Sequence, residues 1–79
     1  MIALMIYLSK TTDYADFIVG LDKEHCTGKV RYYFNNIRQP EIVLPVDCGV
    51  TFLAVMKACA KLKAHLDSGG ELTDIVFQS

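Results

Sequence analysis

One amphipathic segment, residues 50–68, constrains the fold of this 79-residue chain more than any other feature. Apolar side chains recur in it at spacings of three and four residues, which predicts a helix with one buried stripe. The stripe consists of Phe52, Val55, Cys59, Leu62 and Leu66, with Met56 beside it. Gly69 and Gly70 predict the end of the helix, because glycine adopts the left-handed conformation at little cost. Asp47 is the candidate cap or first-turn acid.

Small side chains flank the helical stripe. They are Ala54, Ala58, Ala60 and Ala64. They would let another element approach the helix closely, although alanine is also simply a strong helix former.

Five other segments have the composition and alternation of strands. They are residues 2–8, 14–21, 29–35, 42–44 and 72–77. Short connections between the first four favour an antiparallel meander. We therefore predict a single α+β domain of element order ββββαβ, with a mostly antiparallel sheet of four to five strands and the helix on one face.

The first strand segment is apolar on both of its faces. One face carries Ile2, Leu4, Ile6 and Leu8, and the other carries Ala3, Met5 and Tyr7. A single helix covers one face of a sheet and leaves the other open. Met5, Tyr7 and Tyr33 are candidates for the open face, and we expect a partner chain, for example in a homodimer, to cover it.

The sequence contains no convincing catalytic or metal-binding constellation. Structural zinc sites need closely spaced ligand pairs, whereas Cys26, Cys48 and Cys59 are scattered and odd in number, which indicates a reducing compartment. Cys59 and His65 lie about 120° apart around the helix, and His25 beside Cys26 has no obvious orienting third group. We predict a protein that is not an enzyme and has no metal or cofactor.

The amino-terminal apolar run has no basic region and is too short for a signal peptide or a membrane span. We therefore expect a cytoplasmic protein without membrane association, in its own cell or in an infected host.

The net charge of −1 is the sum of a basic middle segment and two acidic end segments. Residues 29–63 contain six basic and two acidic residues, residues 1–28 two basic and four acidic, and residues 64–79 three acidic only. On one strand face, Lys29, Arg31 and Tyr33 have the pattern with which single-stranded nucleic-acid binders contact phosphates and bases. An ordinary solvated strand face would show the same pattern.

The segment Met5-Ile6-Tyr7-Leu8-Ser9, followed by Tyr14 and Ile18, resembles small phage anti-CRISPR proteins that inhibit type I-F surveillance complexes. The resemblance covers roughly the first half of the chain. It implies a non-catalytic inhibitor in the host cytoplasm that covers a DNA-binding surface, with Tyr7 as the contact residue that carries over. The second-strand tyrosine of that pattern falls at Leu21 here.

A second segment, Ile42-Val43-Leu44-Pro45 followed by Phe52 and a helix, is similar to the last strand and dimerising helix of the PC4/PUR type of single-stranded DNA-binding fold. This chain differs in adding residues 72–77 after the helix and in lacking a strongly basic sheet.

We predict a small protein-binding module that acts as a phage-type inhibitor by occluding a nucleic-acid-binding surface of a host protein or complex. Its predicted docking patch combines the tyrosines Tyr7 and Tyr14, which supply affinity, with the loop acids Asp13 and Asp16, which steer it to a basic surface. The alternative is a homodimeric single-stranded nucleic-acid-binding protein that uses the basic and aromatic strand face described above.

Overall fold

The computed structural model describes residues 1–35 and 38–79. This part of the chain forms five strands and one helix. In chain order they are β1 (Ile2–Lys10), β2 (Tyr14–Gly20), β3 (Gly28–Tyr33), β4 (Glu41–Val43), α1 (Phe52–Asp67) and β5 (Ile75–Gln78). The predicted α+β fold with the order ββββαβ is confirmed.

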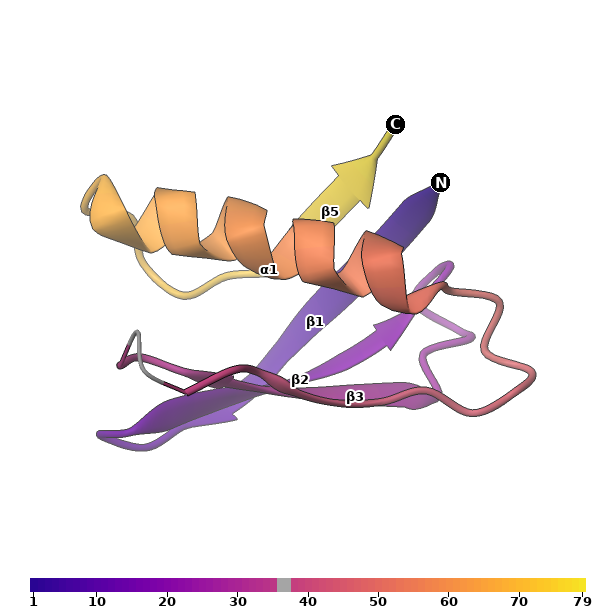
Figure 1. Ribbon diagram of the computed structural model, residues 1–79, viewed down its shortest axis with the longest axis horizontal. Coiled ribbons are helices and arrows are strands. Elements are labelled where there is room, and N and C mark those ends of the chain that lie inside the picture. The colour runs from indigo at the N-terminus through magenta and orange to yellow at the C-terminus, as the bar shows by residue number, and fades with distance from the viewer. Residues whose placement is uncertain (36–37) are drawn as a thin grey trace.

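The strands make one antiparallel sheet in the order β4-β3-β2-β1-β5, with α1 lying across one of its faces (Figure 1). The first four strands form the predicted meander. After the helix, β5 pairs with β1, so that Leu4 lies opposite Val76 and the two chain ends lie side by side. The backbone N–H of Ser79 also donates to the carbonyl oxygen of Met1 at 2.9 Å. β1 therefore has a neighbouring strand on each side.

The core lies between α1 and the inner face of the sheet. Its largest fully buried side chains are Phe17, Met5, Leu62, Val19, Val30 and Val55. Ala54 and Ala58 are also fully buried, while Ala60 and Ala64 are exposed. Two of the four alanines thus let the helix approach the sheet closely. Cys59 belongs to the core as a small apolar side chain.

Phe52 does not belong to the buried stripe of the helix as predicted. It is the first residue of α1 and is 60% exposed. The buried arc is centred between Val55 and Ala58, and Phe52 lies roughly 90° from that centre at the ~100° rotation per residue of an α-helix. Counting spacings of three and four placed the arc too far toward Phe52.

The helix begins and ends at specific capping residues. The hydroxyl oxygen of Thr51, the N-cap, accepts the N–H of Ala54 at 3.1 Å. Asp47, the expected cap or first-turn acid, lies in the preceding loop, so that expectation was wrong. Gly69 has a φ of +91°, as predicted for the residue that ends the helix.

The alternating faces of β1 are as predicted, but the prediction that Met5 and Tyr7 lie on the open face was wrong. Met5 is fully buried beneath the helix, and the ring of Tyr7 packs against Phe17 on the same side, with centroids 5.8 Å apart. Small side chains such as Ala3 and Ala15 lie on this face, which is why the helix packs there. Tyr33 does lie on the open face, as expected.

The described residues contain no helix that is both long enough and apolar enough to cross a membrane.

Candidate protein-binding surface

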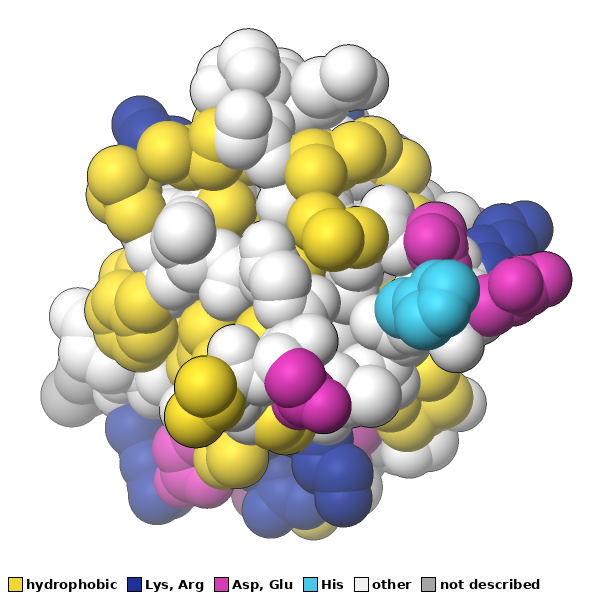
Figure 2. Space-filling model, turned by 90° about the vertical axis from the view of Figure 1, so that its right-hand side faces the viewer, with side chains coloured by type: hydrophobic (Ala, Val, Ile, Leu, Met, Phe, Trp, Pro, Cys, Tyr) yellow, Lys and Arg dark blue, Asp and Glu magenta, His cyan; other side chains and the backbone are white. Residues whose placement is uncertain are grey.

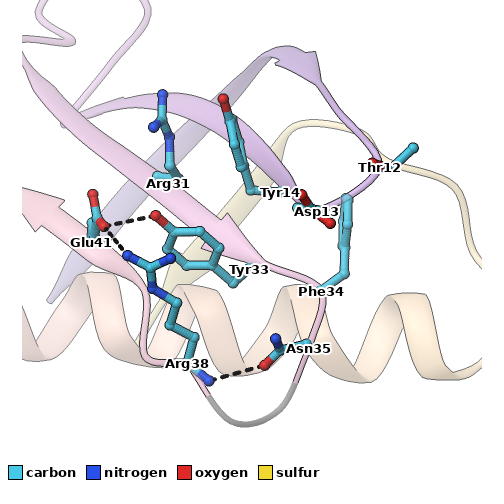
Figure 3. A pocket seen from close by; sticks show the side chains of 9 residues that line it. All are labelled: Thr12, Asp13, Tyr14, Arg31, Tyr33, Phe34, Asn35, Arg38 and Glu41. Carbon is cyan, nitrogen blue, oxygen red and sulfur yellow. Dashed lines mark hydrogen bonds and ion pairs between the residues drawn. The ribbon is translucent and has the colours of Figure 1, made fainter.

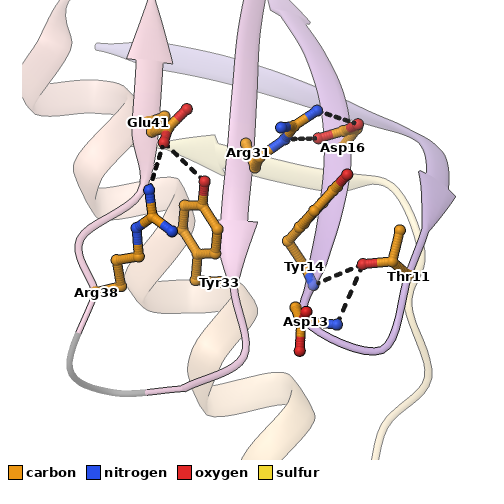
Figure 4. A network of polar contacts seen from close by, with 8 residues as sticks. All are labelled: Thr11, Asp13, Tyr14, Asp16, Arg31, Tyr33, Arg38 and Glu41. Carbon is orange, nitrogen blue, oxygen red and sulfur yellow. Dashed lines mark hydrogen bonds and ion pairs between the residues drawn. The ribbon is translucent and has the colours of Figure 1, made fainter.

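In the described part of the chain, no element covers the sheet face opposite α1. This open face has two halves of different chemistry. The half on β1, β2 and β5 is the apolar patch, made of Ile2, Leu4, Ile6, Leu8, Ile18 and Val76. The half on β2, β3 and the start of β4 is the Arg–Tyr cluster, made of Tyr14, Asp16, Arg31, Tyr33, Arg38 and Glu41 (Figure 4).

The two arginines of the cluster lie over its two tyrosine rings. The guanidinium carbon of Arg31 is 4.0 Å from the ring centroid of Tyr14, and that of Arg38 is 4.2 Å from the ring of Tyr33. The register of β2 with β3 places Tyr14 opposite Tyr33, and their rings meet edge to face at 5.8 Å. Strand pairing thus produces a continuous run of stacked cations and rings.

Two carboxylates hold the arginines in place. Arg31 donates from Nε and Nη2 to the two oxygens of Asp16, at 2.9 and 3.2 Å, which is a bidentate pair. Oε1 of Glu41 accepts the hydroxyl of Tyr33 at 2.7 Å and Nη2 of Arg38 at 3.2 Å. The hydrogen bond to Asp16 is the main reason that the pKa of Arg31 is raised. The hydrogen bond to Glu41 likewise raises the pKa of Tyr33.

The cluster borders an open cleft of about 760 Å³ (Figure 3). Thr12 and Asp13 from the β1–β2 turn, and Phe34 and Asn35 just after β3, complete its wall. The described residues of the cluster, with Lys29 and Asp13 beside them, carry three basic and three acidic side chains. The surface is therefore nearly neutral, and it is rich in tyrosine and arginine.

The structure brings together three of the four residues predicted to bind a protein. Asp13, Tyr14 and Asp16 lie on or beside the cluster. Tyr7 lies on the other side of the sheet, where it borders a separate cleft of about 730 Å³ near the end of α1. Tyr7 and Tyr14 therefore do not form one patch, because they occupy opposite faces of the sheet.

Sequence reasoning missed Arg38 and Glu41. Glu41 lies opposite Arg31 in the pairing of β3 with β4, and Arg38 comes from the connection just before β4. The sequence did contain a signal, because Tyr33, Arg38 and Glu41 lie close together on the two sides of a predicted turn. It becomes informative only once the register of the two strands is known.

The alternative nucleic-acid site, Lys29, Arg31 and Tyr33, does lie on one strand face. Two of these three side chains already bond within the chain, since Arg31 forms an ion pair with Asp16 and Tyr33 donates a hydrogen bond to Glu41. Lys29 is exposed and lies opposite Ile18 in the sheet.

The thiols and histidines do not converge on a site in the described residues. No group of three or more histidine, cysteine or acidic side chains there could hold a metal ion. All three cysteines are free thiols, and burial raises the pKa of Cys59 to about 11. Burial also raises the pKa of Cys26. Burial consequently favours the protonated, weakly nucleophilic form of the Cys26 and Cys59 thiols.

Comparisons of the chain with protein-family models, with curated proteins and with solved structures each gave no match.

Proposed function

We propose that this chain is a small non-catalytic protein-binding module and that the Arg–Tyr cluster is the centre of its docking surface. The observation that carries the proposal is the pair of arginines stacked over tyrosines on an uncovered sheet face. Tyrosine and arginine are enriched among the residues that contribute most to protein–protein affinity. Asp16 and Glu41 fix both arginines before binding, which reduces the entropy lost on association.

The charge balance of the cluster favours a protein partner over a nucleic acid. Phosphate binding relies on cations that are available to replace counterions along the backbone. Arg31 makes a bidentate pair with Asp16 instead, and acidic side chains balance the basic ones across the surface. A partner surface of mixed charge with aromatic or aliphatic groups fits such a face.

In its specific form, the proposal is a phage-type inhibitor that works in the host cytoplasm. Its partner would be a host protein or complex, for example a CRISPR surveillance complex, whose nucleic-acid-binding surface it occludes. Support for docking through the cluster comes from the exposed Asp13 beside Tyr14, which gives the docking surface an acidic margin. The resemblance in the first half of the chain supports the class of inhibitor but not this surface, because its contact residue Tyr7 lies on the opposite face of the sheet.

Site-dependent capture tests the proposal. The immobilised wild-type chain should retain a protein from nuclease-treated host lysate, and Tyr33→Ala or Arg38→Ala should each weaken this binding about 30-fold, because truncating a central interface residue costs ~2 kcal/mol or more. Lys57→Ala, on the exposed outer face of α1, is the matched control and should bind normally. Equal binding by all four proteins would show that the cluster is not the docking surface.

Occlusion is tested on the captured partner. Wild-type chain should release a fluorescent oligonucleotide from that partner, whereas Arg38→Ala should not. A complex that contains partner, oligonucleotide and wild-type chain together would contradict occlusion.

The placement of Lys29, Arg31 and Tyr33 on one face supports single-stranded nucleic-acid binding as a second candidate function. Fluorescence anisotropy with a labelled oligonucleotide at low salt distinguishes the two. Binding that weakens steeply with salt and disappears in Arg31→Ala would favour the second candidate. The absence of binding at low salt would eliminate it.

A further inference from the structure

Each arginine of the Arg–Tyr cluster belongs to a unit of three parts, in which it lies over an aromatic ring and pairs with a carboxylate. In the first unit, the guanidinium carbon of Arg31 is 4.0 Å from the ring centroid of Tyr14, and the two oxygens of Asp16 accept its hydrogen bonds. The second unit, formed by the other arginine, has its guanidinium carbon 4.2 Å from a ring centroid and donates to a glutamate oxygen. The surface therefore repeats one arrangement, in which an arginine joins a ring to an acid.

Asp13 and Phe34 provide a third carboxylate and a third ring at one end of the same cleft (Figure 3). The backbone N–H of Phe34 donates to the carbonyl oxygen of Asp13 at 3.0 Å, which continues the pairing of β2 with β3 by one residue and holds the two residues beside each other. The N–H of Asp13 donates to the hydroxyl oxygen of Thr11 at 3.1 Å. The ring of Phe34 meets that of Tyr32 edge to face, with centroids 6.2 Å apart. Both residues are thus positioned by their own chain.

This third pair, the Asp13–Phe34 site, lacks the arginine that completes the other two. Within residues 1–35 and 38–79, the carboxylate of Asp13 takes part in no hydrogen bond and no ion pair. Asp13 and Phe34 are both exposed. An exposed ring beside an exposed, unpaired carboxylate is open to a cation from outside the chain.

We propose that the Asp13–Phe34 site receives the side chain of one arginine of the partner protein, an inference that rests on the proposed function. The guanidinium donates to both carboxylate oxygens of Asp13 and lies against the ring of Phe34, which repeats the arrangement of the two units within the chain. Arginine fits better than lysine, because its planar, delocalised cation can stack on a ring and form two parallel hydrogen bonds at once.

The cations of the chain itself do not complete the site. Both arginines of the cluster are paired with other carboxylates. Lys29 lies opposite Ile18 on β2, five residues from Asp13, which is roughly 16 Å at the usual rise of a strand and farther than a lysine side chain extends. Lys10 borders the separate cleft near the end of α1. The charge of Asp13 is therefore left for a single cation of the partner to balance.

An arginine is also the side chain that the proposed partner would offer. Surfaces that bind nucleic acids hold phosphate groups with arginine and lysine, and arginine does so through the same two parallel hydrogen bonds that it makes to a carboxylate. The carboxylate of Asp13 would take the place of one phosphate group. The Asp13–Phe34 site thereby gives occlusion a specific contact.

Titration of the isotope-labelled chain with N-acetyl-arginine methylamide, followed by NMR, tests the site without a partner. The amide signals of Asp13 and Phe34 should shift saturably, with a dissociation constant on the order of 10 mM for one exposed ion pair and one ring contact. The citrulline analogue, which has a similar shape and no charge, should leave these signals unchanged. Equal shifts with the citrulline analogue would overturn the proposal, and tighter binding of the lysine analogue would overturn the choice of arginine.

Two pairs of matched variants locate the response. Asp13→Asn removes the charge at nearly constant size and should abolish the shifts, and Phe34→Leu should weaken binding about threefold by removing the ring. Asp47→Asn and Phe52→Leu make the same changes at exposed positions in the loop before α1 and at its first residue, and both should respond like the wild type.

The control positions differ from the site in their surroundings. Figure 2 shows that apolar side chains on the side where α1 begins form several separate groups rather than one continuous surface. A response that persists in Asp13→Asn, or that is lost equally in Asp47→Asn, would contradict the assignment to Asp13.

Partner capture separates failure of this inference from failure of the proposed function. Asp13→Asn should weaken capture about tenfold, because it removes one charge pair at the interface, whereas Asp47→Asn should bind normally. If the wild type captures a partner and Asp13→Asn binds it equally well, the Asp13–Phe34 site is wrong and the docking proposal stands. If no protein is captured, the docking proposal fails, while the arginine titration still decides whether the site binds this cation.

Discussion

At the scale of single residues, close backbone packing makes Gly20 the most restrictive of the five glycines. A Cβ atom at Gly20 would lie 2.0 Å from the carbonyl oxygen of His25 and 2.7 Å from the Cα atom of Cys26. Both neighbours are backbone atoms, so no side-chain rotation can relieve the overlap. The residue is needed because the loop after β2 folds back over the end of that strand.

Gly20→Ala should lower the free energy of unfolding by about 3 kcal/mol, the upper end of the usual range for overpacking. Gly69→Ala is the comparison, because a Cβ atom there meets nothing within 4 Å and the substitution only strains a φ of +91°. That strain costs about 1 kcal/mol. Urea unfolding of both variants measures the difference, and equal losses would show that the loop moves to accommodate alanine.

The phenol of Tyr33 is the second residue-scale test. Its pKa is raised, mainly because it donates a hydrogen bond to Glu41 while protonated. This contribution to stability is complete below the ordinary tyrosine pKa and is lost as pH rises through the raised folded value. In Glu41→Gln, we expect the pKa of Tyr33 to fall, as measured by NMR titration of the labelled ring. An unchanged pKa would mean that Glu41 does not hold the phenol in solution.

At the scale of elements, the sequence predicts whether a segment is a strand or a helix far better than it predicts which elements pack against one another. The alternation in residues 29–33 fixes Val30 and Tyr32 as inward and Lys29, Arg31 and Tyr33 as outward, which the structure confirms. Periodicity alone does not decide which of two apolar faces the helix covers on β1. Which face the helix covers depends on side-chain volume at several strands at once. In this fold the covered face is the one that carries Met5 and Tyr7.

The start of α1 offers an element-scale test between the predicted and the observed cap. Thr51→Ala should lower the free energy of unfolding by about 1 kcal/mol, since it removes the acceptor for the Ala54 N–H. Asp47→Ala should change it by less than about 0.5 kcal/mol, as is usual for surface substitutions. Urea unfolding decides between them, and a larger effect at Asp47 would contradict the observed cap.

At the scale of the whole molecule, the two ends of the chain are mutually dependent. Ile75 of β5 is buried in the core, and the carboxylate of Asp74 accepts the backbone N–H of Tyr7 at 2.9 Å. β5 also gives β1 its second neighbouring strand. The sequence predicts that a last strand exists, but its pairing is a long-range property that local patterns do not encode.

A chain ending at residue 73 should therefore lose its cooperative thermal transition, because both the core contact of Ile75 and the pairing along β1 disappear. Such a loss exceeds what a small domain with ~5 kcal/mol of stability can tolerate. Circular dichroism during heating measures it. A chain ending at residue 78 is the control and should melt like the wild type; a sharp transition in the shorter chain would show that β5 is dispensable.

Four of the six residues of the Arg–Tyr cluster were named from the sequence, and long-range pairing explains why the other two, Arg38 and Glu41, were missed. Tyr14, Asp16, Arg31 and Tyr33 could be read from strand alternation, whereas Glu41 joins them only through the pairing of β4 with β3. Side chains on an open face are constrained by their cross-strand neighbours, and those neighbours are known only from the register.

The pairing of β1 with β5 also sets the order in which this fold can be completed. Leu4 and Val76 are opposite one another although they are separated by almost the whole length of the chain. During synthesis, the meander of β1 to β4 can form while β1 still has a bare hydrogen-bonding edge, and the edge is closed only when residues 75–78 are available. Contacts of such long range slow folding. The interval in which this edge of β1 lacks a neighbouring strand is therefore when the molecule is most exposed to aggregation.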